Sequence, residues 1–429
     1  MITREIIQQN IDYIENNLKA ELTVDELCNA AGYSAVHYCR LFKSFVGVSP
    51  YEYINRRKLL HAVYEMANGC SKTQTAFDYG FQTYAGFYKA FKSEFNCSPT
   101  EFLKQHKSNK PYKVNILQEE NIMISKSRVQ KLLSEWGLQN EETSNVYNEN
   151  TGRQNSNAYY AGDNYIIKFT VNLGSVKRNI SISEALARAD VKSFKIIKTI
   201  SGDNFVQSGE MYFYMTERIK GNQLKCTDIF NNTDLAYEIG KEIAKLHKAF
   251  KTLNEDGYEK ADICTQITDE VKNKLKLSDG FIDAYTEKYI AKYDDLPKQI
   301  IHRDINPSNI LIDNREFSGF LDFDLSEINI RIFDICYFAT SILSECFADA
   351  DIDKNIWFEI LKKTVLGYDS VSPLTIDEKQ AIPYVIYSIQ IICIEYFGKF
   401  DKYKDLERIN TDILKWILLR LPQSVKIAL

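Results

Sequence analysis

The sequence predicts a multidomain fold: an all-α N-terminal domain with two helix-turn-helix units, followed by an α+β C-terminal domain with two lobes. A chain of 429 residues is too long for one ordinary hydrophobic core. The first hundred residues contain an internal repeat with a spacing of 48 or 49 residues. Further along, short apolar strands enclose polar loops, which is typical of an α+β domain.

Composition and apolar patterning predict a cytoplasmic protein. Hydrophobic residues make up 45% of the chain and charged residues 26%, as in soluble globular proteins. Residues 1–18 predict an amphipathic helix instead of a charged and then apolar leader. The most apolar stretch, 381–397, is interrupted by Pro383 and polar residues, so we expect a buried helix and no membrane partner. Nine cysteines without CxxC spacing predict reduced thiols rather than a disulfide framework.

Charge is unevenly divided along the chain. The net charge is −5, yet residues 1–110 carry 13 Lys and Arg against 11 Asp and Glu, which is +2 and leaves −7 for the rest. A basic segment joined to an acidic one is compatible with a nucleic-acid partner for the first segment, although the asymmetry is modest.

The repeat predicts helix, tight turn and helix in each copy. Three motifs recur: Phe-Lys-Ser at 42–44 and 91–93, Ser-Pro at 49–50 and 98–99, and glycine before an aromatic residue at 32–33 and 80–81. Capping residues and a glycine mark the elements: Thr23, Gly32 and Ser34 in the first copy, and Ser71 or Thr73, Gly80 and Thr83 in the second. This spacing favours helix-turn-helix units over two helical hairpins that only pack together.

The two copies, with Arg-Leu-Phe-Lys at 40–43 and Lys-Ala-Phe-Lys at 89–92, resemble the AraC-type transcription regulators over residues 3–106. The resemblance implies double-stranded DNA as the partner. It implies base-facing positions at Val36, Cys39 and Arg40 in the first unit and at Ala85, Gly86 and Lys89 in the second. Of these, only Arg40 and Lys89 can donate to a guanine edge. Phosphate contacts are expected from His37, Lys43, Lys92 and the basic run 56–58.

A domain boundary is expected where helical periodicity stops. Residues 107–121 lose the periodicity and contain Pro111. We therefore predict a DNA-binding domain over 1–108, a linker over 109–121 and a second domain over 122–429. Within the second domain, the lobes are expected at about 122–220 and 221–429.

The second domain contains a motif suited to phosphoryl transfer. His-Arg-Asp at 302–304 follows an apolar strand, Asn309 comes five residues after Asp304, and Asp322 follows the next strand. Phosphoryl transfer needs a carboxylate to orient and deprotonate the attacking hydroxyl, and metal ligands to neutralise the phosphates. Asp304 suits the catalytic role, and Asn309 and Asp322 suit the metal-binding role.

Here the chain resembles the aminoglycoside phosphotransferase and choline kinase family, a small-molecule branch of the protein-kinase-like fold, over residues 122–420. The resemblance implies ATP (or another nucleoside triphosphate) with Mg²⁺, an N-lobe with a five-stranded sheet and a mostly helical C-lobe. It implies that Asp334 braces the catalytic loop, with a helix N-cap as the alternative. It implies Lys168 on the α- and β-phosphates with Glu184 as its partner, although Ser181 to Glu184 is also a capping box.

Other parts of the second domain give weaker indications. The adenine is expected at backbone atoms near Thr216 and Arg218, after the last N-lobe strand. The region 148–161 would cover the phosphates but contains Gly152 without a G-x-G-x-x-G motif. Acidic and aromatic residues suit a cationic acceptor such as an amine or aminoglycoside, with core packing as the alternative: Glu327, Glu345, Glu395, Tyr384, Tyr387 and Tyr396.

Three functional hypotheses follow. The first is a sequence-specific transcription regulator joined to a small-molecule kinase, which transfers the γ-phosphate of ATP to a hydroxyl group. In the second, the kinase-like domain is a non-catalytic sensor of a ligand or nucleotide that controls DNA binding. The third is an antibiotic-resistance phosphotransferase with a secondary DNA-binding module. The fold alone does not choose the acceptor or effector.

Overall fold

The computed structural model describes residues 2–105, 110–111, 114–117, 123–148, 154–263, 272, 275–399 and 403–421. The chain divides into two compact units. The first comprises Met1–Leu173 and Ile196–Arg218, and the second comprises Gly174–Lys195 and Ile219–Leu429. The boundaries expected at 108 and 121 fall inside the first unit and stay predictions.

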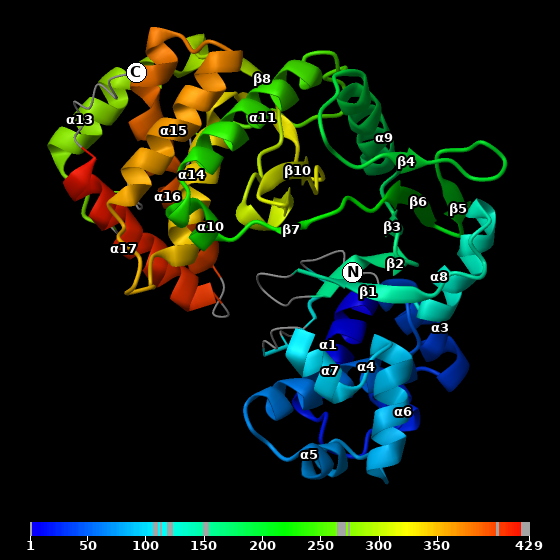
Figure 1. The fold of residues 1–429 in the computed structure, drawn as a ribbon. Coiled ribbons are helices and arrows are strands. Elements are labelled where there is room, and N and C mark those ends of the chain that lie inside the picture. The colour runs from blue at the N-terminus through cyan, green and yellow to red at the C-terminus, as the bar shows by residue number, and fades with distance from the viewer. Residues whose placement is uncertain are drawn as a thin grey trace. The chain divides into compact units, whose positions relative to one another are not determined.

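The N-terminal part of the first unit is all α-helical, as predicted (Figure 1). Its helices are α1 (Ile2–Asn16), α2 (Val24–Ala31), α3 (Ala35–Val46), α4 (Pro50–Ala67), α5 (Lys72–Asp78), α6 (Tyr84–Phe95) and α7 (Pro99–Gln105). Thr23 closes a capping box with Glu26 at the start of α2, and Ser34 and Thr83 cap α3 and α6. Both helix-turn-helix units are therefore present.

Local sequence explains both the turns and the core of these units. Gly32 and Gly80 have φ of +71° and +81°, a left-handed conformation that glycine adopts without steric cost. Helices α3 and α6 bury aromatic or aliphatic side chains at every fourth residue: Tyr38, Phe42 and Val46 in α3, and Phe87, Phe91 and Phe95 in α6. The opposite face of each helix is left to solvent.

The rest of the first unit is a sheet with short helices at its start. Helix α8 (Lys126–Leu132) and the 3-10 helix η1 (Leu133–Trp136) precede the strands β1 (Thr143–Tyr147), β2 (Gln154–Ala161), β3 (Tyr165–Thr170), β4 (Ile196–Ile197), β5 (Val206–Ser208) and β6 (Met211–Glu217). The strand order is β1-β2-β3-β6-β4, with β5 also paired to β6. The sheet has six strands where five were expected, and two of the six, β4 and β5, are only two and three residues long.

The second unit is mostly helical. Its helices are α9 (Leu173–Arg188), α10 (Cys226–Asn231), α11 (Asp234–Phe250), α13 (Asp279–Lys288), η2 (Ile290–Asp295), η3 (Pro307–Asn309), α14 (Ile332–Cys346), α15 (Ile356–Val371), α16 (Ile376–Gly398) and α17 (Lys404–Arg420). Its strands are β7 (Asn222–Gln223), β8 (Lys298–Ile301), β9 (Ile310–Asp313), β10 (Glu316–Phe320) and β11 (Glu327–Ile330). They form the small antiparallel sheets β10-β9-β7 and β11-β8.

One described helix, α16, is long and apolar enough to cross a membrane. In the structure 67% of its most apolar window is buried, and Pro383 lies inside it. This agrees with the expectation of a buried helix for residues 381–397.

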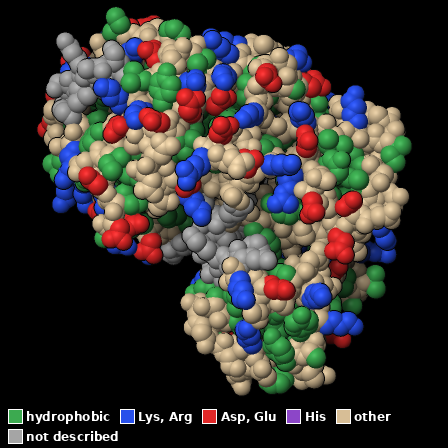
Figure 2. Space-filling view, in the orientation of Figure 1, with side chains coloured by type: hydrophobic (Ala, Val, Ile, Leu, Met, Phe, Trp, Pro, Cys, Tyr) green, Lys and Arg blue, Asp and Glu red, His purple; other side chains and the backbone are tan. Residues whose placement is uncertain are grey.

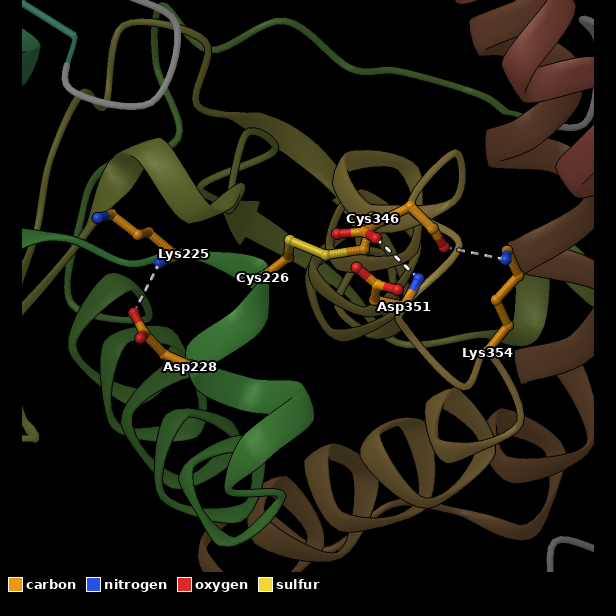
Figure 3. Close-up of a disulfide and its surroundings, with 7 residues drawn as sticks. Lys225, Cys226, Asp228, Cys346, Asp351 and Lys354 are labelled. Carbon is orange, nitrogen blue, oxygen red and sulfur yellow. Dashed lines mark hydrogen bonds between the residues drawn. A yellow bond between two sulfur atoms is a disulfide. The ribbon is translucent and has the colours of Figure 1, made fainter.

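A disulfide joins Cys226, the first residue of α10, to Cys346, the last residue of α14 (Figure 3). Their Cα atoms are 6.3 Å apart, a separation typical of disulfides. The expectation of reduced thiols is therefore wrong for this pair. The two cysteines are 120 residues apart, and the packing of α10 on α14 brings them together, so sequence spacing could not reveal the pair.

Candidate functional site

The predicted DNA-facing residues lie on the solvent-exposed faces of α3 and α6. In α3, Val36 is 65% exposed, and His37, Arg40 and Lys43 are also exposed, whereas Cys39 is half-buried and packs against the domain core. In α6 the exposed residues are Ala85, Gly86, Lys89 and Lys92. The predicted residues thus share one exposed face on each helix, except that the half-buried Cys39 has little surface available to contact a base.

Tyr88 belongs to the same exposed face of α6 and was missed in the sequence. Its side chain is 39% exposed. It lies three residues after Ala85 and four before Lys92, so helical spacing alone could have indicated it. An aromatic ring at this position adds an apolar contact of the kind that recognises a thymine methyl group.

The expectation that Arg56 and Arg57 contact phosphates is wrong. Arg57 is buried and forms a two-point ion pair with Glu15 of α1, at 2.6 Å and 2.8 Å. Arg56 pairs with Glu94 of α6 at 3.0 Å. Both guanidinium groups form ion pairs with carboxylates inside the unit, so Arg56 and Arg57 stabilise packing between helices. On the face shown in Figure 2, cationic and anionic side chains are interspersed rather than gathered into one patch.

Asp304 lies in a loop, residues 302–309, between β8 and β9; we call it the catalytic loop. Three neutral side chains donate hydrogen bonds to its carboxylate. Asn309 Nδ2 donates to Asp304 Oδ2 at 2.9 Å, and Asn306 Nδ2 donates to Oδ1 at 2.9 Å. The hydroxyl of Tyr337, from α14, also donates to Oδ1 at 3.0 Å. These donors fix the orientation of the carboxylate relative to the loop.

Tyr337 contacts the predicted base Asp304 and was not singled out from the sequence. Burial, and then the charge of Asp304, raise the pKa of Tyr337 well above its usual value. Its hydroxyl therefore stays protonated and acts as a donor at neutral pH. The ring stacks on Phe333, with centroids 5.7 Å apart. Its position three residues after Asp334 on a helix was the only signal in the sequence.

Asp334 braces the catalytic loop through backbone contacts. Its carboxylate accepts hydrogen bonds from the N–H groups of His302 and Arg303, both at 2.8 Å. Arg303 has φ of +71°, an uncommon conformation for a residue with a side chain, and these bonds help to hold it. Helix α14 begins at Ile332, so Asp334 lies inside the first turn and the N-cap alternative is wrong.

Glu327 supports the loop and is not free to bind an acceptor. It is buried on β11, forms an ion pair with Arg303 at 2.8 Å and accepts a hydrogen bond from Asn329 at 2.9 Å. Burial raises the pKa of Glu327, while the bonds from Asn329 and Arg303 oppose that rise. The expectation that Glu327 faces a cationic acceptor is therefore wrong, because its cationic partner is already in the loop.

Asn309 and Asp322 suit a divalent cation. The Asn309 amide nitrogen is committed to Asp304, which turns its amide oxygen away from that carboxylate. The backbone N–H of Leu321 donates to Asn309 O at 2.8 Å, so the residue before Asp322 is bonded directly to Asn309. Carboxylate and amide oxygens are the ligands that Mg²⁺ prefers. The donor set therefore fits the expected metal.

Helix α9 reaches the same segment through Asp324. Asn179 Nδ2 donates to Asp324 Oδ1 at 2.8 Å, and the Ser175 hydroxyl donates to the same oxygen at 3.3 Å. Sequence analysis did not single out Asn179, although a buried asparagine on an amphipathic helix is a usable signal. These contacts hold the residues around Asp322 to α9.

The predicted nucleotide-binding residues are divided between the two units. Lys168 lies on β3, half-buried and opposite Tyr214 of β6. Glu184 is exposed on α9 in the second unit. Because α9 begins at Leu173, residues 181–184 lie in the helix interior, and the capping-box alternative is wrong.

The predicted adenine contacts lie at the end of β6. Thr216 is buried and pairs with β3 and β4. The Arg218 N–H donates to Asn164 O at 2.7 Å, and its guanidinium lies 4.2 Å from the ring centre of Tyr160. Gly152, in the expected phosphate-covering region, lies outside the described residues.

The remaining acceptor candidates differ in exposure. Tyr384 and Tyr387 are buried in the core of α16, so core packing is the correct interpretation for them. Tyr396 is 51% exposed, Glu345 is exposed and Glu395 is half-buried.

Two family models match separate parts of the chain. A helix-turn-helix domain model matches residues 27–105, and a phosphotransferase enzyme family model matches residues 151–355. The HTH-type transcriptional activator AarP of Providencia stuartii is 32% identical over 96 residues, which are 22% of this chain and 71% of AarP. The homoserine kinase of Gluconobacter oxydans is 27% identical over 161 residues; these are 35% of this chain but only 49% of that kinase.

Solved structures share the fold of the C-terminal domain. The amicoumacin kinase hAmiN, solved with AMP-PNP, Ca²⁺ and Ami, has a TM-score of 0.52 at 15% identity and covers 68% of this chain and 93% of its own. A microcompartment-associated aminopropanol kinase has a TM-score of 0.51 at 14% identity, over 69% of this chain and 98% of its own.

The fold and the loop geometry thus define a transcription-regulator domain joined to a small-molecule kinase-like domain. The chain belongs to the AraC-type helix-turn-helix family through its N-terminal domain, and residues 151–355 match the phosphotransferase enzyme family model.

Proposed function

We propose that this protein is a DNA-binding transcription regulator whose second domain transfers the γ-phosphate of ATP, or of another nucleoside triphosphate, to a hydroxyl group of a small acceptor. The arrangement of Asp304 carries the proposal. A carboxylate fixed by three neutral donors, in a loop braced by Asp334, suits a base that must meet one hydroxyl in one orientation.

Each remaining residue has a role in this proposal. The acceptor hydroxyl gives its proton to Asp304 as its oxygen bonds to the γ-phosphorus, and the bond to the nucleoside diphosphate breaks. Asn309 and Asp322 would hold Mg²⁺, whose charge offsets that of the phosphates. Lys168 would bind the α- and β-phosphates with Glu184 as its partner, and backbone atoms near Thr216 and Arg218 would bind the base.

A small amino alcohol is the acceptor class that we favour. Two of the similar proteins are named for homoserine and aminopropanol, which both carry an amine and a hydroxyl group. In this chain Glu395 and Tyr396 of α16 keep exposed surface and could face a cationic amine.

The structure of the first unit supports control of DNA binding by the second domain. Asn145 of β1 donates to the carbonyl of Glu94 near the end of α6 at 3.0 Å. The N–H of Met123 donates to the carbonyl of Val46 at the end of α3 at 2.7 Å. The second helix of each helix-turn-helix unit, α3 or α6, is therefore hydrogen-bonded near its carboxyl end to the segment 123–147, which precedes the residues that match the phosphotransferase family. We place the protein in the cytoplasm, where DNA and ATP are both present.

The test is turnover of Mg-ATP by the full chain against a panel of amino alcohols, amines and aminoglycosides, with phosphorylated product identified by mass spectrometry. We expect turnover with at least one amino alcohol. Nucleotide binding without turnover on any acceptor would favour a sensor. Absence of nucleotide binding would defeat the kinase and nucleotide-sensor hypotheses together.

Arg40→Ala is expected to relax base preference in one half of the DNA site, at a cost of about 1–3 kcal/mol, because Arg40 can donate two bonds to guanine. Lys43→Ala, a matched exposed cation on the same helix, should weaken binding to all sequences alike. Fluorescence anisotropy on a selected site and on its single-base variants measures both effects. Uniform loss in both variants would make Arg40 a phosphate contact only.

A further inference from the structure

The Cys226–Cys346 disulfide connects the two elements that hold the catalytic loop at its two ends. One of them is the segment from β7 to α10. Gln223 Nε2 donates to Ser308 O at 2.8 Å, and the N–H of Leu224 donates to Ile310 O at 2.9 Å. These bonds flank Asn309, the expected metal ligand. Cys226 follows Leu224 after one intervening residue.

The other element is helix α14. Its first turn holds the beginning of the loop, where Asp334 accepts the N–H groups of His302 and Arg303. One turn later Tyr337 donates to Asp304. Cys346 ends the same uninterrupted helix, about 14 Å beyond Tyr337 at the usual rise per residue. Because a helix is stiff over this length, a shift of Cys346 moves Tyr337 as well, and with it the hydrogen bond that holds Asp304.

The disulfide therefore closes a ring that runs from the catalytic loop through β7, α10, the two sulfur atoms and α14 back to the loop. Figure 3 shows the bond where α10 meets the end of α14, with Lys225, Asp228, Asp351 and Lys354 around it. Cys346 is buried, whereas Cys226 is half-buried. Of the two cysteines, Cys226 is therefore the one that keeps solvent-exposed surface.

We propose that Cys226 and Cys346 are a reversible thiol–disulfide pair that sets the order of the catalytic loop, the oxidised form being the one competent for transfer. In forming the bond, each thiol loses its proton. The two electrons and two protons pass to a small-molecule disulfide, which becomes two thiols. Disulfides in reducing compartments are usually transient and redox-sensing, which suits this role. The effect on transfer rests on the proposed function, whereas the effect on loop order does not.

The experiment equilibrates the full chain in oxidised and reduced glutathione at graded ratios. Maleimide mass shifts count the thiols, hydrogen exchange reports the amides of 302–310, and Mg-ATP turnover is measured on the same samples. We expect oxidation to remove two thiols, located by peptide mapping at 226 and 346. Reduction should speed exchange in the loop by about tenfold or more and lower turnover several-fold.

Variants separate this pair from the other cysteines. Cys226→Ser, at a half-buried position, should reproduce the reduced state and abolish the response to glutathione. Cys346→Ser should do the same, and Cys226→Ser alone suffices if the buried variant fails to fold. Cys70→Ser changes an exposed free cysteine of the first unit and should keep the full response.

Several results would overturn the proposal: no loss of thiols at any ratio, equal loop exchange in both states, or a response that survives in Cys226→Ser. The outcome differs if the proposed function alone fails. In that case the wild-type protein binds no Mg-ATP, yet loop exchange still follows the thiol count.

Discussion

Asp304→Asn is expected to lower turnover by about 10²–10⁴, the usual contribution of a positioned general base, while Mg-ATP affinity stays nearly unchanged. The amide cannot accept the acceptor proton, but it has nearly the shape of the carboxylate and can still accept from Asn309, Asn306 or Tyr337. Calorimetry with Mg-ATP and a turnover assay on the same preparation measure both quantities.

Asp322→Asn is the matched comparison, since it makes the same chemical change at an expected metal ligand. It should weaken Mg-dependent nucleotide binding itself, because a negative charge is lost beside the triphosphate. If Asp304→Asn also lost nucleotide affinity, or if both variants kept full turnover, Asp304 would not be the base. A DNA-binding response to Mg-ATP that is unchanged in Asp304→Asn would favour the sensor hypothesis.

Local signals in the sequence were sufficient for much of the fold. The caps at Thr23, Ser34 and Thr83 and the turns at Gly32 and Gly80 act on their immediate neighbours, and the structure contains all of them. In the catalytic loop, the five-residue spacing of Asp304 and Asn309 singled out both residues, and the structure shows that they are hydrogen-bonded to each other.

Long-range partners could not be predicted in this way. Arg56 and Arg57 appear as free cations in the sequence, and the carboxylates that pair with them come from α6 and α1. Glu327 forms an ion pair with Arg303, and Cys226 forms a disulfide with Cys346. A charge or thiol is assigned correctly from sequence only when its partner lies nearby in the chain.

The buried ion pair of Glu15 and Arg57 gives the largest expected effect on stability. Arg57→Leu should lower the local unfolding free energy of α1 and α4 by about 3–5 kcal/mol, because it leaves the Glu15 carboxylate buried without its cation. The Glu15 side chain is 1% exposed. Native-state hydrogen exchange of the full chain measures this loss amide by amide.

Two comparisons test whether the loss comes from the unpaired charge. The double variant Glu15→Leu with Arg57→Leu should recover much of the stability, since no buried charge remains. Lys19→Ala breaks an exposed pair with Glu65 and should cost less than about 1 kcal/mol. A double variant no more stable than Arg57→Leu would mean that the pair contributes through packing and not through charge.

Acid should weaken the same contact in the wild-type protein. Burial raises the pKa of Glu15, but hydrogen bonds from His61 and Arg57, the charge of Arg57 and a bond from Tyr53 outweigh it and lower the pKa to about 2. Because the folded pKa lies below the ordinary value of 4.5, the contribution is complete above about pH 4.5 and disappears as the pH falls towards 2. The full change corresponds to about 3 kcal/mol.

Hydrogen exchange of α1 and α4, corrected for intrinsic rates, measures this effect between pH 5 and 3. The unfolding free energy of the wild type should fall as the pH is lowered, whereas that of the double variant should change less with pH. Equal slopes in the two proteins would assign the acid sensitivity to other carboxylates.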